Sequence, residues 1–225
     1  IIPKIRGRFR SVPMQELLNE AKRLASEGVK ELVLVAQETT LYGKDLTGEK
    51  QLPLLLHELC KIEGIEWIRL LYCYPEEITD ELIKVIKTEE KVCNYIDMPI
   101  QHSENRILQR MGRRTSREDL VAVIKKLRKE IPDITIRTTL ITGFPGESQE
   151  DHEGLMNFVE ECQFDRLGVF TYSPEEDTLA ATFEDQIDEE VKEERRDELM
   201  SLQQEISYEH TQQLVGKTIK VMVEG

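Results

Sequence analysis

Five apolar segments of the sequence are each followed at once by polar residues that could hold a ligand. These polar stretches are Gln37 to Thr40, Tyr74, Gln101 to Ser103, Thr142 to Glu147, and Thr171 to Ser173. Turns that only reverse the chain are usually rich in Gly, Asn, Asp or Pro. The composition therefore indicates a binding or catalytic edge. The sequence contains no Ser-His-Asp grouping, no metal-spaced His pair and no Walker loop.

The most specific of these stretches is TLITGFPGES, residues 139–148. A strand here runs into Gly143 and then into Pro145 and Gly146, and Ser148 can cap the helix that follows. Such a turn could hold the adenine or phosphate of a nucleotide-like ligand. Alternatively, the glycines serve only the steric needs of a tight left-handed turn. The residues alone leave both interpretations open.

Charged side chains occur inside two of the apolar segments. Arg69 and Arg137 lie in predicted strands, as does Asp97. A guanidinium in a sheet core is costly unless it is paired or faces a polar cavity, so we expect Asp97 to pair with one arginine and at least one arginine to face the site. Arg137 should share one surface with Thr139 and Ile141 because alternate residues of a strand face the same side. Arg137 is our candidate for binding a ligand carboxylate.

Single histidines and cysteines give weaker signals. His102 is either a ligand or proton shuttle, or a side chain that satisfies a hydrogen bond beside a helix start; the second role is the more common. The four cysteines, Cys60, Cys73, Cys93 and Cys162, are scattered singly without metal-type spacing. We expect reduced and mostly buried thiols.

These residues must be positioned by strands that alternate with helices. The apolar segments predict strands at 31–37, 67–73, 95–100, 135–141 and 166–170. Helical periodicity and caps predict helices from Pro13 to Gly28, after Thr79, after Ser116, after Ser148, and from about Asp188 to Gln213. The pattern indicates an α/β fold with a parallel sheet, either open and doubly wound or a partial barrel, with the site at the carboxyl ends of the strands. The alternating stretch KTIKVMVEG, residues 217–225, predicts a strand that begins a further small β domain.

The charge of the chain bears on its partners. Its 225 residues carry 30 Lys and Arg against 44 Asp and Glu, a formal charge of −14. An acidic protein repels a phosphate backbone, so nucleic acid is the less favoured partner and a basic protein the more favoured one. The excess also fits exposed helix faces that need no partner. Without a long apolar run or a leader in the sequence, we expect no membrane association and a cytoplasmic location.

Six segments, taken in order, resemble the radical S-adenosylmethionine (SAM) methylthiotransferases. They are IIPKIRGRFRS, VAQETTLYG, IRLLYCYP, DMPIQHSENRILQRMGRR, TLITGFPGES and FTYSPEEDT. The resemblance covers essentially the whole chain and implies a partial (β/α) barrel. It divides the chain into a radical SAM core at 1–175, an acidic linker with a long helix at 176–215, and the first strand of a TRAM domain at 216–225.

The resemblance also assigns residues to the methionine and ribose parts of SAM. Gln37 and Glu38 match the position that holds the methionine amino group. Gln101 follows the strand whose end approaches the ribose. Arg137 remains our own candidate for the SAM carboxylate.

The adenine is implied to lie against the fourth and fifth strands. Thr139, Ile141 and Gly143 match the family's G-x-I-x-G strand, with Thr139 standing where the family has Gly. Tyr172 falls in the adenine-contacting turn of the last strand.

The chemistry implied by the resemblance is radical chemistry. A four-iron four-sulfur cluster reduces SAM to a 5′-deoxyadenosyl radical, which takes hydrogen from the β-carbon of an aspartate in the twelfth protein of the small ribosomal subunit. An auxiliary four-iron four-sulfur cluster of an N-terminal domain supplies sulfur, and a second SAM supplies the methyl group. A sulfur-delivery or adaptor protein is a further expected partner.

Two alternatives stand beside this hypothesis. One is the tRNA-adenosine branch of the family, which usually has G-Q-N-V-N at 36–40, a T-S-H-P-like turn at 72–75 and Q-S-G at 101–103; the residues present favour the ribosomal-protein branch. The other is a non-catalytic scaffold that keeps the barrel and has lost the cluster.

The start of the sequence bears on the cluster. The resemblance places Ile1 directly after the last cysteine of the family's C-x-x-x-C-x-x-C motif, with Pro3, Arg6 and Gly7 completing the cluster loop. The cluster ligands are thus absent from this chain. We expect the chain by itself neither to bind the radical-generating cluster nor to turn over.

Overall fold

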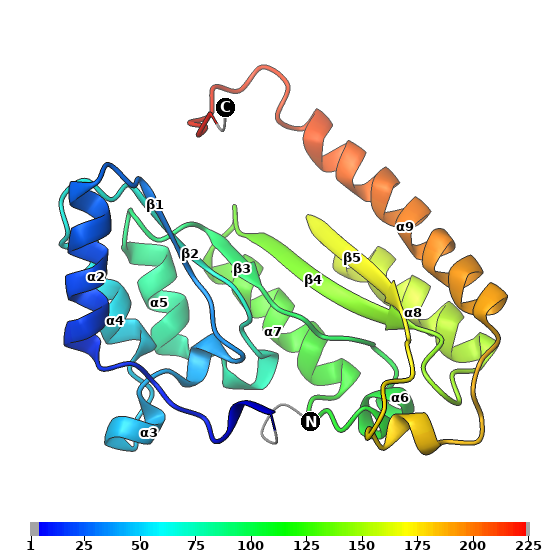
Figure 1. Ribbon diagram of the computed structural model, residues 1–225. Helices are drawn as coiled ribbons and strands as arrows, with labels where there is room; N and C mark the ends of the chain where they lie inside the picture. Colours follow the sequence, from blue (N-terminus) through cyan, green and yellow to red (C-terminus); the bar gives the residue numbers. More distant parts are fainter. Residues whose placement is uncertain (1–4, 224–225) are drawn as a thin grey trace.

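The computed structural model describes residues 5–223 and consists of parallel strands covered on one side by helices (Figure 1). The strands are β1 (Glu31–Leu34), β2 (Trp67–Leu70), β3 (Tyr95–Asp97), β4 (Thr135–Thr142) and β5 (Arg166–Thr171). The helices are α2 (Met14–Ser26), α3 (Lys44–Thr47), α4 (Leu52–Cys60), α5 (Asp80–Thr88), α6 (Asn105–Arg110), α7 (Arg117–Glu130), α8 (Gln149–Cys162) and α9 (Glu189–Gln212). Short 3₁₀ turns follow β1, β2 and β5, namely η1 (Thr39–Leu41), η2 (Pro75–Glu77) and η3 (Ala180–Thr182).

The strands follow one another across the sheet in chain order. β1 pairs with β2, and β3, β4 and β5 pair in sequence. A parallel bridge between Ile68 and Val92 joins the two groups, as does a hydrogen bond of 2.9 Å from the amide of Cys73 to the carbonyl of Asp97. A doubly wound sheet reverses its strand order at a switch point, and this sheet has no reversal. The predicted α/β fold of partial-barrel type is confirmed, and the sheet does not close on itself within residues 5–223.

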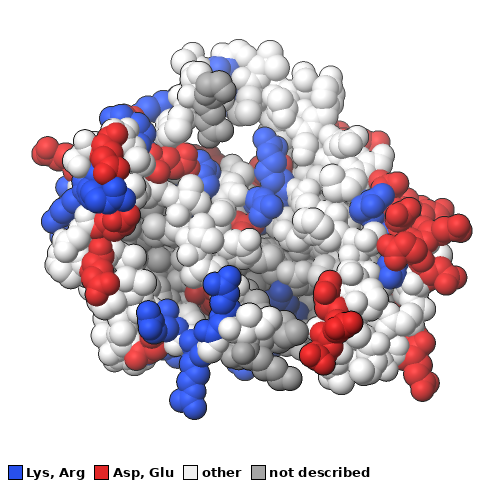
Figure 2. Space-filling view, in the orientation of Figure 1, with Lys and Arg blue, Asp and Glu red and all other residues white. Residues whose placement is uncertain are grey.

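The two faces of the sheet differ in burial. Along β4, Ile136, Thr138, Leu140 and Thr142 are buried against the helices, and the residues between them are partly exposed on the concave face. Arg137, Thr139 and Ile141 therefore share one surface, as the alternation predicted. Figure 2 shows the concave face as a hollow with Lys and Arg side chains near its centre.

The helix starts follow the predicted caps. Ser116 and Ser148 begin α7 and α8, and each forms a capping box with the aspartate three residues later. The hydroxyl of Thr79 accepts from the amide of Leu82 at the start of α5. α2 begins after Pro13, and Gly28 follows its end with φ +93°. None of the helices in residues 5–223 is long and apolar enough to cross a bilayer.

The C-terminal part departs from the sequence prediction at one point. α9 begins and ends within one residue of the predicted limits and packs on β5 and α8, where it buries Leu199 and Ile206. Residues 217–223 form no strand, although the sequence alternates as a strand would. A strand needs a neighbour for its backbone hydrogen bonds, and these residues lie exposed beyond α9 without one. Glu224 and Gly225 lie outside the described residues, as do residues 1–4 with Pro3, and the TRAM domain stays a prediction.

We expect the two faces of β1 to differ in their tolerance of substitution. Leu32→Ala should lower the free energy of unfolding by about 2–5 kcal/mol, because it empties a buried site facing the helices. Val33→Ala, on the concave face where the residue is 47% exposed, should cost less than about 1 kcal/mol. Urea unfolding of the two variants checks this expectation. Equal losses would show that the concave face is packed as tightly as the helical face.

Candidate functional site

The loops that follow the strands lie along one edge of the sheet (Figure 1, lower edge). Helix α6, turn η3 and the segment that precedes α2 lie at the same edge. Parallel strands bring their carboxyl ends to the same edge, where α/β enzymes hold their ligands. The side chain of Ser11 fixes the N-terminal segment there by accepting from the amide of Gly43 at 2.9 Å. The edge at which the sequence predicted the site is thus formed by segments far apart in the sequence.

Glu38 is a buried carboxylate in the loop after β1, directly before η1. One of its oxygens, Oε1, accepts from the amide of Thr40 at 2.9 Å and of Tyr74 at 3.4 Å, and also contacts the Thr40 hydroxyl. The other oxygen, Oε2, is buried and has no hydrogen-bond partner among the described residues. Burial raises the pKa of this carboxyl above its usual value, although the hydrogen bonds oppose the rise. Oε2 is therefore placed to accept from an N–H donor of a ligand, while the neighbouring Gln37 is exposed.

Gln101 lies against β4 at the same edge. Its amide donates to the carbonyl of Thr139 at 2.9 Å, and its carbonyl accepts from the amide of Ile141 at 2.8 Å. Its φ is +76°, a conformation that residues other than glycine seldom adopt. Such strained positions are concentrated at functional sites. Three predicted site residues thus meet at one point.

The loop after β4 is held by a side chain that the sequence analysis did not single out. Glu147 is 2% exposed, and its Oε2 accepts from the amides of Gly143 at 2.8 Å and Phe144 at 3.3 Å. The ring of Phe144 packs edge-on against that of Tyr172, with centroids 5.2 Å apart. Gly143 has φ +68°, so the steric need for glycine is real. The structure brings the Gly143 loop and Tyr172 together as the two walls of one corner.

Arg137 is paired rather than free. Its Nη1 lies 2.5 Å from Oδ1 of Asp97, which is buried, and Oδ2 of Asp97 accepts from the amide of Tyr72 at 3.1 Å. The predicted pair with Asp97 is confirmed. The guanidinium is still partly exposed on the concave face, so its role toward a ligand carboxylate remains a prediction. The other strand arginine, Arg69, pairs with Glu31 at 2.5 Å.

His102 satisfies a local hydrogen bond. The ring is fully buried, and its Nδ1 accepts from the amide of Glu104 at 3.0 Å at the start of α6. Its Nε2 lies 3.6 Å from Oε2 of Glu147. The more common of the two roles considered for this residue is the one the structure shows.

The cysteines are poor candidates for metal ligands. Burial raises the pKa of the Cys60 and Cys162 thiols to about 11, and it also raises the pKa of Cys73. Metal ligation needs the thiolate. Among residues 5–223, no three His, Cys, Asp or Glu side chains gather as a metal site. The described residues therefore do not fit an iron-sulfur cluster, whereas the free oxygen of Glu38 fits the amino group of a ligand.

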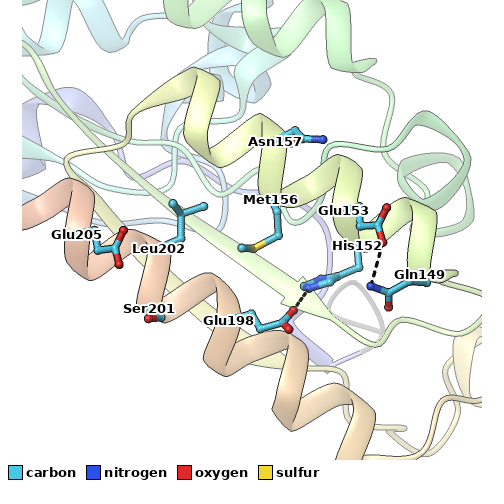
Figure 3. Close-up of a pocket in the computed structure, with 9 residues that line it drawn as sticks. All are labelled: Gln149, His152, Glu153, Met156, Asn157, Glu198, Ser201, Leu202 and Glu205. Carbon is cyan, nitrogen blue, oxygen red and sulfur yellow. Dashed lines mark hydrogen bonds and ion pairs between the residues drawn. The ribbon is translucent and has the colours of Figure 1, made fainter.

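A groove of about 570 Å³ lies between α8 and α9 (Figure 3). His152 points across it, and its Nε2 contacts Oε2 of Glu198 at 2.6 Å. Met156 and Leu202 line the groove from the two helices. It lies where α9 attaches to α8, and none of the predicted site residues lines it.

Comparison with known proteins identifies the family. The model of the Radical SAM superfamily matches residues 1–159. The chain is 63% identical over its whole length to the ribosomal protein uS12 methylthiotransferase RimO of Lachnoclostridium phytofermentans, 58% identical to that of Clostridium perfringens and 54% identical to that of Desulfitobacterium hafniense. It spans about half the length of these curated relatives.

Solved structures share the fold at low sequence identity. The radical SAM methyltransferase TsrM of Kitasatospora setae, solved with cobalamin and a [4Fe-4S] cluster, matches 73% of this chain and 32% of its own, at 17% identity and a TM-score of 0.60. SuiB of Streptococcus suis matches 90% of this chain and 41% of its own, at 16% identity and a TM-score of 0.56. With a family model that covers most of the chain and these shared folds, the chain belongs to the radical SAM superfamily.

Proposed function

We propose that this chain is the central part of a radical SAM methylthiotransferase that acts in the cytoplasm on ribosomal protein uS12, adding a methylthio group to the β-carbon of an aspartate. The observation that carries the proposal is the identity of 54–63% over the full chain with proteins named for that activity. The neighbours in fold support only the radical SAM barrel, because they are less than 20% identical.

The residues at 36–40, 72–75 and 101–103 favour the ribosomal-protein branch over the tRNA branch. Two of the three segments that distinguish these branches, 36–40 and 72–75, meet where Oε1 of Glu38 accepts from the amide of Tyr74. The family's tRNA branch usually has Asn in place of Glu38 in G-Q-N-V-N. The carboxylate of Glu38 thus contacts a second segment in which the two branches differ.

The residues of the chain would hold SAM along the strand ends. Glu38 would accept from the methionine amino group through Oε2, and Gln101 would face the ribose. The adenine would lie against the corner formed by the Gly143 loop and Tyr172, with Thr139 and Ile141 beneath it. SAM together with a four-iron four-sulfur cluster supplies a radical that can take hydrogen from an unactivated carbon.

The thiolates for the clusters would come from outside this chain. We propose a C-x-x-x-C-x-x-C motif directly before Ile1 for the radical-generating cluster and a separate N-terminal domain for the auxiliary one. Arg6 and Gly7 would complete the loop around the first cluster. The buried cysteines of the barrel keep their protons and would not compete for iron.

Charge supports a basic protein as substrate. The net charge of −14 opposes binding of a phosphate backbone and favours a cationic partner. Acidic side chains gather over the side of the molecule occupied by α8 and α9 (Figure 2, right). A sulfur-delivery or adaptor protein would be a further partner, and a TRAM domain after α9 would take part in substrate recognition.

The activity itself can be assigned with the full-length protein. After cluster reconstitution, it should add a methylthio group to the aspartate of a uS12 peptide and leave tRNA unmodified, as judged by mass spectrometry of both substrates. A peptide with Asn in place of the target Asp is the control for the site. Modified tRNA with an unmodified peptide would contradict the proposal.

Glu38→Gln should weaken SAM binding by roughly tenfold or more, because the amide replaces the charged acceptor that faces the methionine amino group. Isothermal titration of the full-length protein measures the change. Glu76→Gln, on an exposed neighbour in η2, is the matched control and should bind as the wild type does. Equal affinity of the Glu38 variant would remove Glu38 from the site.

The same substitution should change stability with pH. Because the pKa of Glu38 is raised in the folded state, folding favours its protonated form, and the free energy of unfolding falls as pH rises through that pKa. The stability of Glu38→Gln relative to wild type should therefore increase from pH 4 to pH 7. Urea unfolding of the two proteins at both pH values measures the change. If the free energy of unfolding of the variant relative to the wild type falls as pH rises, the burial of an ionised carboxylate is contradicted.

The chain alone should not assemble the radical-generating cluster. Anaerobic reconstitution of residues 1–225 should leave less than stoichiometric iron and sulfide, because the described residues offer no set of thiolates. The full-length protein, treated in parallel, is the control. Stoichiometric iron and sulfide with a reducible cluster signal in the chain alone would contradict this expectation.

A further inference from the structure

Helix α9 carries polar side chains on its buried face. The face is formed by residues at spacings of three and four, and it includes Lys192, Arg195, Leu199, Gln203 and Ile206. A buried charge is costly unless it is paired. The partners of Lys192 and Arg195 therefore show what the first half of the helix is built to contact.

Arg195 neutralises the carboxylate that holds the loop after β4. Its Nη1 donates to Oε1 of Glu147 at 2.9 Å and to the carbonyl of Glu147 at 3.1 Å. The other carboxylate oxygen of Glu147 holds the amides of Gly143 and Phe144. One guanidinium of α9 thus balances the charge on which the loop conformation rests.

Lys192 contacts both walls of the same corner. A side chain at Gly143 would meet it, since an added Cβ would lie 2.1 Å from Cγ of Lys192. Its Nζ donates to the carbonyl of Tyr172 at 3.0 Å. Its own carbonyl accepts from the hydroxyl of Thr142 at 3.3 Å.

We infer that α9 is a positioning element of the SAM site, with Lys192 and Arg195 holding the Gly143 loop and the Tyr172 turn at the spacing that the adenosine needs. The inference rests on the proposed function, which places the adenosine against those two segments. Neither side chain needs to touch SAM, because Lys192 acts through the backbone of Tyr172 and Arg195 acts through the Glu147 carboxylate that holds the loop. Since coupling between two sites is reciprocal, SAM should in turn protect the first half of α9.

The experiment uses the full-length, cluster-reconstituted protein and two readouts that do not depend on turnover. Titration calorimetry gives the dissociation constant for SAM, and hydrogen exchange reports on the amides of Gly143 and Phe144 and on residues 189–199. Arg195→Met and Lys192→Met keep the aliphatic stems and remove the charged ends. Arg196→Met is the matched control, because among residues 5–223 Arg196 pairs only with its exposed neighbour Asp197.

We expect Arg195→Met and Lys192→Met to weaken SAM binding on the order of tenfold, to speed exchange at Gly143 and Phe144, and to leave exchange in α5 unchanged. Arg195→Lys should recover part of the affinity, since it restores the charge. SAM should slow exchange in residues 189–199 of the wild type. Arg196→Met should match the wild type in each measurement.

Two results would overturn the inference. Wild-type affinity and loop exchange in the folded Arg195 and Lys192 variants would show that α9 does not position the site; if Arg195→Met fails to fold, Lys192→Met decides alone. Failure of the wild type to bind SAM would overturn the proposed function together with this inference. Binding by the wild type and by both variants alike would overturn the inference only.

Discussion

The carboxylate of Glu147 is shared between two parts of the molecule that are distant in the sequence. One oxygen holds the amides of the loop after β4, and the other is paired with Arg195 of α9. Both side chains are almost fully buried. A buried carboxylate without its cation would be strongly destabilising, so the docking of α9 stabilises the loop in this shape. This contact and the bond from Lys192 to the carbonyl of Tyr172 both support the corner between Gly143 and Tyr172.

Elsewhere in the candidate site, buried polar side chains also hold backbone groups in place. Buried polar atoms near the strand ends are used to fix backbone, as at His102 and Asp97. Oε2 of Glu38 is different, because it is buried and has no partner among the described residues. Nε2 of His102 and the hydroxyl of Tyr172 are also buried without a partner within residues 5–223. Oε2 of Glu38 is the carboxylate oxygen among these atoms, and a carboxylate acceptor suits an N–H donor of a ligand. The proposed placement of the methionine amino group rests on this open carboxylate oxygen.

Much of the fold could be predicted from the sequence. The strands and most helices followed from apolar runs, capping boxes and helical spacing, and the limits of α9 were accurate to one residue. The ends of β1, β2 and β3 were each placed three residues too late, at Gln37 in place of Leu34 for β1, because the apolar run continues past the paired backbone. The ends of β4 and β5 were each placed one residue too early. Helix α4 was missed, since its run LPLLLHELC is apolar on nearly all sides and shows little helical periodicity.

The sequence indicated which residues gather at the carboxyl edge of the sheet but not the side chains that support them. The alternation of β4 indicated the shared surface of Arg137, Thr139 and Ile141, and the predicted pair with Asp97 was present. Glu147 and Arg195 could not be paired from the sequence, because they lie 48 positions apart and their residue types suggest solvent. The spacing of Lys192 and Arg195 with Leu199 and Ile206 was the one signal available.

The central claim is that this edge of the sheet is a SAM site with its two ends at Glu38 and at the corner of Gly143 and Tyr172. A crystal structure of the full-length protein with SAM bound tests it most directly. The account predicts the methionine amino nitrogen within hydrogen-bond distance of Oε2 of Glu38 and the adenine against the Gly143 loop. SAM bound elsewhere, for example in the groove between α8 and α9, with Oε2 of Glu38 still without a partner, would contradict it.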